Sequence, residues 1–207
     1  MTPPPILNSA GRTAIQIFRQ HHGLLRTGEA IRQGIHPATL YALRDAGRLE
    51  PLSRGLYRLA DLPPLSNPDL TVVARRFPKA VICLISALAF HNLTDQVPHV
   101  IDIAISSHAE RPVLAYPPLR VFWFSEAALQ AGAEVHTIDH TPILITCPEK
   151  SLADIFKYRH KLGSDVALEA LKFYLRRRRR PQVDKLLEYA RVCRVEKVMR
   201  PYLEALL

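Results

Sequence analysis

RTGEAIRQGIHPATLYALRDAGRLEPLSRGLYRL, residues 26–59, contains in succession the signals of two short helices and a β-hairpin. Thr27 is a residue type that caps helix N-termini, and Gly34 is a type that follows helix C-termini, so a helix of under two turns is predicted between them. Pro37 predicts the start of a second helix, because proline is favoured at the first helical position, and Gly47 predicts its end. Two short helices joined by a glycine-containing turn are typical of a helix-turn-helix.

The residues that follow predict a β-hairpin. Two short strands are predicted at residues 48–52 and 56–59, on either side of the glycine turn Ser53-Arg54-Gly55. A hairpin directly behind a helix-turn-helix is the element order of a winged helix. The apolar residues of the segment 12–22 recur at helical spacing and predict one further helix before the motif. We therefore expect a winged helix-turn-helix over residues 1–62, with a generic unit of short helices and a hairpin as the alternative.

The rest of the chain predicts a second domain. Residues 62–69, LPPLSNPD, contain three prolines and disfavour a continuous helix or strand, which places the boundary there. Beyond it, helices are predicted at 69–77, capped by Asp69, and at 85–93, and strands at 100–106, 119–125, 135–140 and 142–147, the last two as a hairpin. From Pro148 onward the signals are helical, with further helices at 165–179, 182–193 and 196–206. The predicted fold class is α+β: the winged helix, then an α/β domain over 63–207 with a helical C-terminal end.

Composition and charge narrow the class of protein. The 207 residues are 48% hydrophobic and 23% charged, as in folded globular proteins. The net charge is +9, with +4 in residues 1–62, −2 in 63–140 and +7 in 141–207, so polyanions are the expected partners. The three cysteines form no CxxC pair, and the longest apolar run, residues 80–90, is too short to span a membrane. We expect a reduced, cytoplasmic protein with no membrane partner.

The second helix of the motif is the expected DNA-recognition element. On a helical wheel Leu40 and Leu43 fall on one side, and Ala38, Tyr41 and Arg44 on or near the other. Arg44 suits a guanine, but pairing with a nearby carboxylate or with phosphate is the simpler alternative. Tyr57 is expected in the core. The predicted DNA-binding residues are Thr27, His36, Ala38, Tyr41, Arg44, Arg48, Arg54 and Arg58.

A run of five arginines, Arg176 to Arg180, is the strongest local charge feature. Such a run is tolerated at a helix end because it is solvated and complements the helix dipole, and that is the structural explanation. The functional alternative is a second phosphate-contacting surface. Its candidate residues are Lys172, Arg176, Arg177, Arg178, Arg179, Arg180 and Lys185.

Enzymatic functions find little support. The sequence contains no GxGxxG, GxxxxGK[ST] or GxSxG motif. His136 and His140 fall on one face of a predicted strand, but no carboxylate or cysteine completes a metal site, so structural roles are expected. We expect no catalytic residues, no metal and no cofactor.

Three blocks of the sequence resemble one family. Residues 26–59 resemble the N-terminal winged helix of AbiEi-type antitoxins, the DNA-binding members of bacterial type IV toxin–antitoxin systems. Residues 83–98, CLISALAFHNLTDQVP, and 148–175, PEKSLADIFKYRHKLGSDVALEALKFYL, look like the C-terminal domain of that family. The arginine run is not an expected family feature. The later blocks contain Ser86, His91, Lys150, Asp154, Lys157 and Arg159, whose roles are antitoxic or structural; a surface ion pair between Asp154 and Lys157 is one expectation.

The resemblance implies a repressor of its own toxin–antitoxin operon that binds inverted repeats in double-stranded DNA near the promoter. It implies a nucleotidyltransferase-like toxin as genetic partner, with direct contact left open. Two alternatives from other classes stay open: an antitoxin that inhibits its toxin by protein contact, and a nucleic-acid-processing enzyme with a winged-helix targeting domain. Operator sequence and oligomeric state are not predicted.

Overall fold

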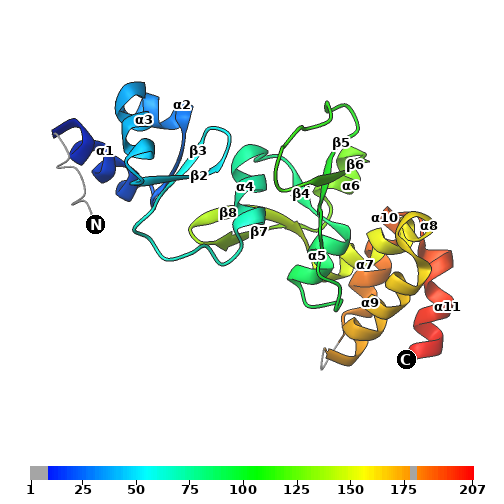
Figure 1. Ribbon diagram of the computed structural model, residues 1–207. Helices are drawn as coiled ribbons and strands as arrows, with labels where there is room; N and C mark the ends of the chain where they lie inside the picture. Colours follow the sequence, from blue (N-terminus) through cyan, green and yellow to red (C-terminus); the bar gives the residue numbers. More distant parts are fainter. Residues whose placement is uncertain (1–8, 178–180) are drawn as a thin grey trace.

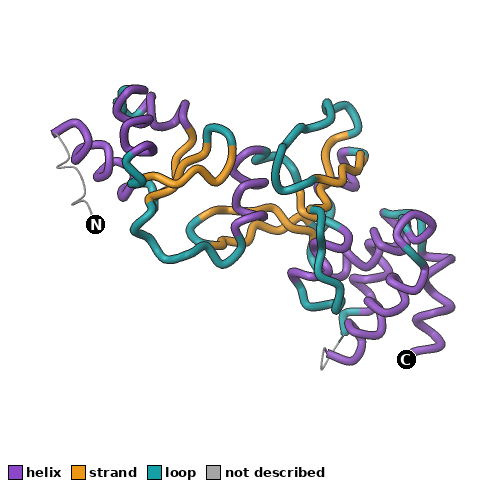
Figure 2. Tube along the Cα trace, in the orientation of Figure 1, coloured by secondary structure: helices purple, strands orange, loops and turns teal. Residues whose placement is uncertain are grey.

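The computed structural model describes residues 9–177 and 181–207. The molecule is elongated: a small helix-and-strand unit lies at one end, a larger sheet in the middle and a group of helices at the other end (Figure 1). The strands fall into two separate groups, and helices dominate the C-terminal end (Figure 2). The α+β class predicted from the sequence is confirmed.

The N-terminal unit contains the predicted helices and hairpin in the predicted order. Its elements are α1 (Ser9–Gln20), β1 (Leu24–Arg26), α2 (Thr27–Arg32), α3 (Pro37–Asp45), β2 (Leu49–Ser53) and β3 (Leu56–Leu59). The three strands form an antiparallel sheet in the order β1-β3-β2. The short strand β1 was not predicted, because three residues are too few for an alternating pattern to be recognised.

The core of this unit comes from the apolar faces of its helices and strands. Phe18 of α1 and Leu40 of α3 are fully buried, and Leu25, Leu43 and Leu59 are nearly so. The spacing of Leu40 and Leu43 turns one face of α3 to the core and leaves the opposite face for solvent.

A mixed five-stranded sheet forms the middle of the molecule. Its elements are α4 (Pro68–Arg76), β4 (Val81–Ile82), α5 (Leu84–Phe90), β5 (Ile101–Ser106), β6 (Leu119–Phe124), α6 (Glu126–Gln130), β7 (Ala133–Ile138) and β8 (Thr141–Thr146). The strand order is β6-β5-β4-β8-β7; β5 and β6 run parallel, as do β4 and β8, whereas β7 and β8 form the predicted antiparallel hairpin. The two-residue strand β4 and the single-turn helix α6 were missed because neither is long enough to show a period.

Helices cover this sheet on both faces. Ile103 and Ile145 pack in one cluster with residues of α4, whereas Ala104 packs in another with residues of the helical end. That end consists of α7 (Pro148–Lys157), α8 (Arg159–Leu162), α9 (Ser164–Arg177), α10 (Val183–Val192) and α11 (Glu196–Leu206). All three cysteines are buried and free.

The expected surface ion pair between Asp154 and Lys157 is wrong. Asp154 is buried, and both of its carboxylate oxygens accept hydrogen bonds from the buried Lys150 Nζ at 2.6 Å. Cys193 Sγ donates to the same carboxylate at 3.2 Å. Burial raises the pKa of Asp154, and Lys150 opposes that rise. Spacings of three and four residues both place side chains on one helix face, so the sequence did not discriminate between the two lysines.

Two predicted helix caps are also wrong. Arg26, not Thr27, is the N-cap of α2, and the Glu29 carboxylate accepts its backbone N–H at 2.8 Å. Asn67, not Asp69, caps α4 by accepting the Leu70 N–H at 3.4 Å. Each error is a shift of one or two residues, the usual uncertainty of helix ends.

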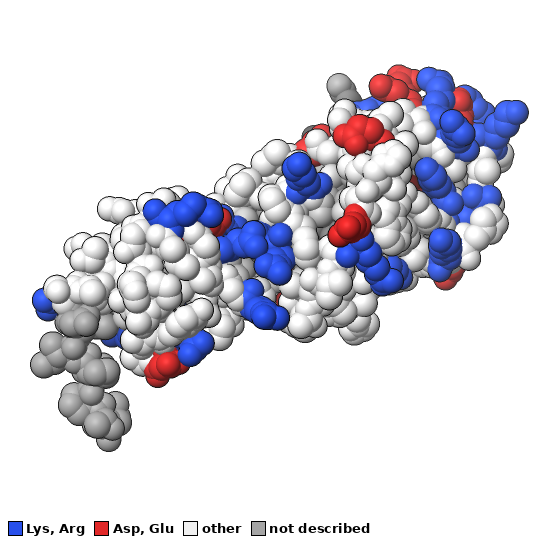
Figure 3. All heavy atoms as spheres, turned by 90° about the horizontal axis from the view of Figure 1, so that it is seen from above, with Lys and Arg blue, Asp and Glu red and all other residues white. Residues whose placement is uncertain are grey.

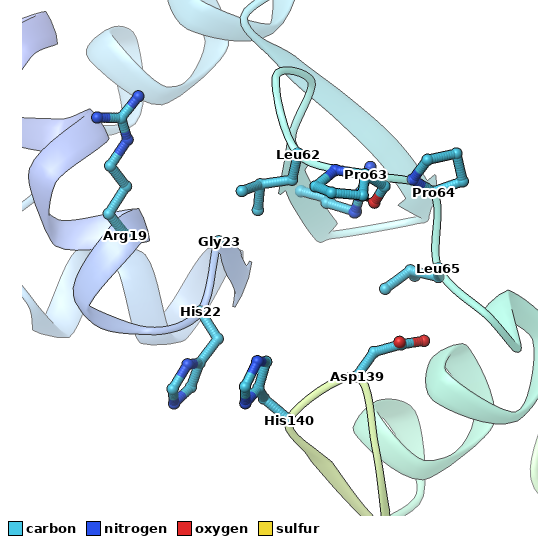
Figure 4. Close-up of a pocket in the computed structure, with 10 residues that line it drawn as sticks. Arg19, His22, Gly23, Leu62, Pro63, Pro64, Leu65, Asp139 and His140 are labelled. Atoms are coloured by element: carbon cyan, nitrogen blue, oxygen red, sulfur yellow. The ribbon is translucent and has the colours of Figure 1, made fainter.

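The N-terminal unit packs against the central sheet. Leu24 and Leu56 form an apolar cluster with Val72 of α4, and Ser66 donates to the Asp139 carboxylate at 2.8 Å. The rings of His22 and His140 stack with centroids 4.3 Å apart beside a pocket of about 380 Å³ (Figure 4). His140 therefore lies in the β7–β8 turn, not on a strand face beside His136 as predicted.

Candidate nucleic-acid interface

The exposed face of α3 carries an aromatic and a cationic side chain together. Tyr41 is 41% exposed and the Arg44 side chain 40% exposed, whereas Leu40 and Leu43 on the opposite face are buried. The Arg44 guanidinium carbon lies 5.0 Å from the centroid of the Tyr41 ring, within the range of a cation–π contact. The partial exposure of Arg44 leaves its guanidinium accessible to solvent beside the ring.

Arg44 also pairs with its neighbour in the chain. Arg44 Nε donates to Asp45 Oδ1 at 2.8 Å, and this hydrogen bond raises the pKa of the guanidinium, helped by the Tyr57 hydroxyl. Arg44 is therefore paired with a nearby carboxylate, which was one of the alternatives that the sequence left open. Because Asp45 is itself exposed, the pair is solvated and worth little energy.

The N-terminal residues of α3 have a structural role as well as an exposed position. His36 is the N-cap of the helix, and its Nδ1 accepts the Ala38 N–H at 3.2 Å. Both residues are exposed at the start of the helix, before Tyr41 and Arg44.

The hairpin turn lies against the start of α2. Gly55 has a positive φ of 73°, and its carbonyl accepts the Thr27 N–H at 2.9 Å and the Thr27 hydroxyl at 3.4 Å. Arg54, next to Gly55, is exposed. The two hydrogen bonds from Thr27 therefore hold the turn against the start of α2.

The prediction that Arg58 contacts DNA from the protein surface is wrong. Its side chain is 6% exposed, Nη1 donates to Glu50 Oε1 at 2.6 Å, and Nη2 donates to the Pro63 carbonyl. The alternation of β3 predicts an outward position, but the linker after β3 covers the side chain. Tyr57 is buried as predicted, and Arg48 is half-buried.

A family model described as "Transcriptional regulator, AbiEi antitoxin" matches part of this chain, and the matched part contains α2, α3 and the hairpin. Residues 12–60 match the AbiEi antitoxin family. The predicted resemblance is confirmed over these residues, which we call the AbiEi segment. A search of curated proteins found no match.

The fold of nearly the whole chain is similar to that of a protein of known structure. The crystal structure of the RV2827C protein from Mycobacterium tuberculosis is similar with a TM-score of 0.51 and 16% sequence identity, over 94% of this chain and 80% of that chain. At this identity the similarity shows the fold alone. It extends through the central sheet and the helical end as well as the AbiEi segment.

The predicted second basic surface is described in part. Lys172 and Arg176 lie on α9, whereas Lys185 is half-buried with its Nζ 3.8 Å from Glu149 Oε2. Arg178, Arg179 and Arg180 lie outside the described residues, and the side chain of Arg177 is not described either. The run therefore stays a prediction.

Sequence reasoning missed a group of arginines that combines residues of the AbiEi segment with a residue of α4. Arg26, Arg32 and Arg76 line one pocket, to which α4 contributes Arg76. Lys and Arg side chains gather in a band over this part of the molecule, where α2, the hairpin turn and α4 lie (Figure 3). The pair Arg75-Arg76 at the end of a helix was visible in the sequence, but its approach to α2 depends on the tertiary fold.

Clusters of metal-ligand side chains and membrane-spanning helices are both absent from the described residues. In the ranges 9–177 and 181–207, no three His, Cys, Asp or Glu side chains are grouped to hold an ion. Nor is any helix in those ranges long and apolar enough to cross a bilayer.

Proposed function

We propose that this protein is a DNA-binding transcriptional repressor with two domains, residues 1–62 and 63–207, and that it represses its own toxin–antitoxin operon. The observation that carries the proposal is the exposed pair of Tyr41 and Arg44 on α3. The match of residues 12–60 to a family of transcriptional regulators supports it.

The proposed mechanism places α3 in the major groove. Arg44 exchanges the Asp45 carboxylate for the O6 and N7 atoms of a guanine, a bidentate contact worth about 1–3 kcal/mol of discrimination. His36, Ala38 and Tyr41 approach neighbouring base edges from the same face. Thr27, Arg48 and Arg54 contact the phosphate backbone and fix the register of the helix.

The proposed operator is an inverted repeat near the promoter of the protein's own gene. Two copies bind the two half-sites, either as a dimer or separately. The proposed genetic partner is a nucleotidyltransferase-like toxin. We propose that the protein acts in the cytoplasm, without a cofactor and without catalysing a reaction itself.

A mobility-shift titration on the DNA upstream of the gene, at two salt concentrations, tests this proposal. We expect tighter binding to that duplex than to a scrambled duplex of equal length and composition. Equal affinity for both duplexes at both salt concentrations would contradict specific repression. Co-purification with the toxin encoded beside it, together with equal affinity for both duplexes, would favour an antitoxin that acts by protein contact.

A further inference from the structure

A basic pocket lies where the helix-turn-helix, the hairpin turn and α4 meet. Its volume is about 280 Å³, and its lining residues are Arg26, Thr27, Gly28, Glu29, Arg32, Gly55 and Arg76. Two of these residues are glycines, so backbone forms part of the wall. Arg76 comes from α4, beyond the predicted winged helix, so two parts of the chain build the pocket together.

The three arginines of the pocket carry uncompensated charge. Among the side chains that the structure describes, none forms an ion pair or hydrogen bond with the guanidinium groups of Arg26, Arg32 or Arg76. The pocket's one acidic residue is already engaged: Glu29 Oε2 accepts the Arg26 N–H and also Arg75 Nη2. Three like charges that line one pocket attract an anion, because an anion between them reduces their mutual repulsion.

The arrangement of the pocket is fixed by contacts on each side. The Glu29–Arg75 ion pair joins α2 to α4, and the apolar cluster of Leu24, Leu56 and Val72 packs the two parts together beneath it. The Arg32 guanidinium lies over α2 near Gly28, where a Cβ at position 28 would be in ordinary contact with Arg32 Nη1 at 3.6 Å. The elements that carry the three arginines are therefore fixed relative to one another, although Arg32 and Arg76 are themselves exposed.

We infer that this pocket binds a single backbone phosphate of the DNA whose bases α3 reads, an inference that rests on the proposed function. Guanidinium groups match the geometry of phosphate oxygens and form charge-assisted hydrogen bonds to them. One phosphate shared by residues of α2 and α4 fixes the angle between the duplex and the whole molecule. Arg76 makes the part of the chain beyond residue 62 a contributor to DNA affinity.

Arg76→Ala tests the inference on the full-length protein, with Lys197→Ala as a control that removes one positive charge from α11, at the opposite end of the molecule (Figure 1). We expect Arg76→Ala to weaken binding about tenfold, equally for the upstream and scrambled duplexes, because a charged hydrogen bond to phosphate is removed. The slope of log affinity against log salt concentration should fall by about 0.9. Lys197→Ala should change neither quantity.

Two further measurements separate one shared phosphate from several. The triple variant Arg26→Ala/Arg32→Ala/Arg76→Ala should lose no more salt slope than the single variant, because only one phosphate is released. In ethylation interference on the upstream duplex, ethylation of one phosphate should abolish binding of the wild type, weaken binding of Arg76→Ala less and have no effect on binding of the triple variant. Circular dichroism confirms that each variant is folded.

Several results would overturn the inference. In one, the wild type prefers the upstream duplex and Arg76→Ala binds DNA as tightly as the wild type does. The proposed function would then stand, but the pocket would not be a phosphate site. A triple variant whose slope falls about three times as far as that of the single variant would indicate separate phosphates. Tight binding of inorganic phosphate that Arg76→Ala abolishes without changing DNA affinity would indicate a site for free phosphate. If the wild type shows no sequence preference, the proposed function itself fails.

Discussion

Arg44 lies between two partners on α3. A hydrogen bond to Asp45 raises the pKa of its guanidinium, helped by the hydroxyl of the buried Tyr57. The guanidinium also lies over the Tyr41 ring, and both Tyr41 and Asp45 are exposed. Such interactions cost little to exchange, because solvent and counter-ions replace them readily. Arg44 therefore lies at the helix surface and can exchange its exposed partners for groups on DNA.

Arg44→Ala should reduce the preference for the upstream duplex over a scrambled one by about 1–3 kcal/mol, with little reduction of affinity for the scrambled duplex. Asp45→Asn is the matched variant in the opposite direction: it removes the competing carboxylate and a negative charge near DNA and should tighten binding. Fluorescence anisotropy on both duplexes measures the effects. An unchanged preference in Arg44→Ala would exclude this residue from base recognition.

His91 makes the stability of the protein depend on pH. Its Nε2 lies 2.8 Å from the Thr146 carbonyl, to which the neutral ring donates, and burial lowers its pKa. The unfolded chain binds the proton at about pH 6.5, so stability is fully present above that pH and is lost as the pH falls toward the lowered folded-state pKa. Urea denaturation at pH values above and below this range should show a lower free energy of unfolding at the lower pH. This pH-dependent decrease should be smaller in His91→Gln. His160→Gln, outside the core, should leave it as in the wild type.

The buried Lys150–Asp154 pair predicts a large penalty for removing one partner. Asp154→Ala leaves the Lys150 ammonium uncompensated among apolar neighbours and should destabilise the protein by about 3–5 kcal/mol. The double variant Lys150→Met/Asp154→Leu should recover most of that stability, because no buried charge remains. Chemical denaturation measures both. A double variant as unstable as the single one would show that the pair is required for the packing itself.

At the scale of elements, the hairpin turn and α2 depend on each other. The Gly55 carbonyl accepts two hydrogen bonds from Thr27, and β1, which ends at Arg26, pairs with β3. The hairpin of β2 and β3 is therefore joined to the helix-turn-helix in two ways, by the hydrogen bonds to Thr27 and by the pairing of β3 with β1. Movement of the turn would move the start of α2 and the basic pocket beside it.

Gly55→Ala should destabilise the protein by about 1–2 kcal/mol, because φ at this position is 73° and L-residues are disfavoured there. The added Cβ would also lie 3.4 Å from Thr27 Oγ1. Gly28→Ala is the matched control, since this glycine lies within α2, where alanine is favoured by about 1 kcal/mol. We expect opposite shifts of the denaturation midpoint in the two variants; shifts of the same sign would contradict the account of the turn.

At the scale of the whole molecule, the excess of positive charge lies in the first 62 and the last 67 residues of the chain, and Lys and Arg side chains are spread along one face of the elongated body (Figure 3). The positive field attracts a duplex before specific interactions form, and sequence preference comes later from α3. DNA affinity should therefore fall steeply with salt for every sequence. Preference between sequences should change much less.

The double variant Lys172→Ala/Arg176→Ala tests whether the helical end binds DNA. If the second basic surface is used, the salt slope should fall by about 0.9 for each phosphate that the variant no longer binds, equally for specific and scrambled duplexes. Arg12→Ala/Lys161→Ala removes the same charge from α1 and α8 and serves as the control. A slope unchanged from the wild type would mean that α9 presents a solvated face only.

The sequence by itself determined the helix-turn-helix, the hairpin and the exposed face of α3. These features depend on local signals: a proline at a helix start, glycines at helix ends, and apolar residues three apart at Leu40 and Leu43. It also predicted most helices and strands of the remainder, except those of two to five residues such as β4 and α6. Elements of two to five residues are too short to show a period in the sequence. Long-range partners stabilise them once the chain has folded.

Only the tertiary structure decided which charged side chains are free. Arg58 alternates outward on its strand, yet the linker covers it and Glu50 pairs with it. Arg76 lies at an ordinary helix end in the sequence, yet packing of α4 brings it beside Arg26 and Arg32. The physical reason is range: backbone geometry acts over a few neighbouring residues, whereas burial and charge pairing depend on segments that meet only when the chain has folded.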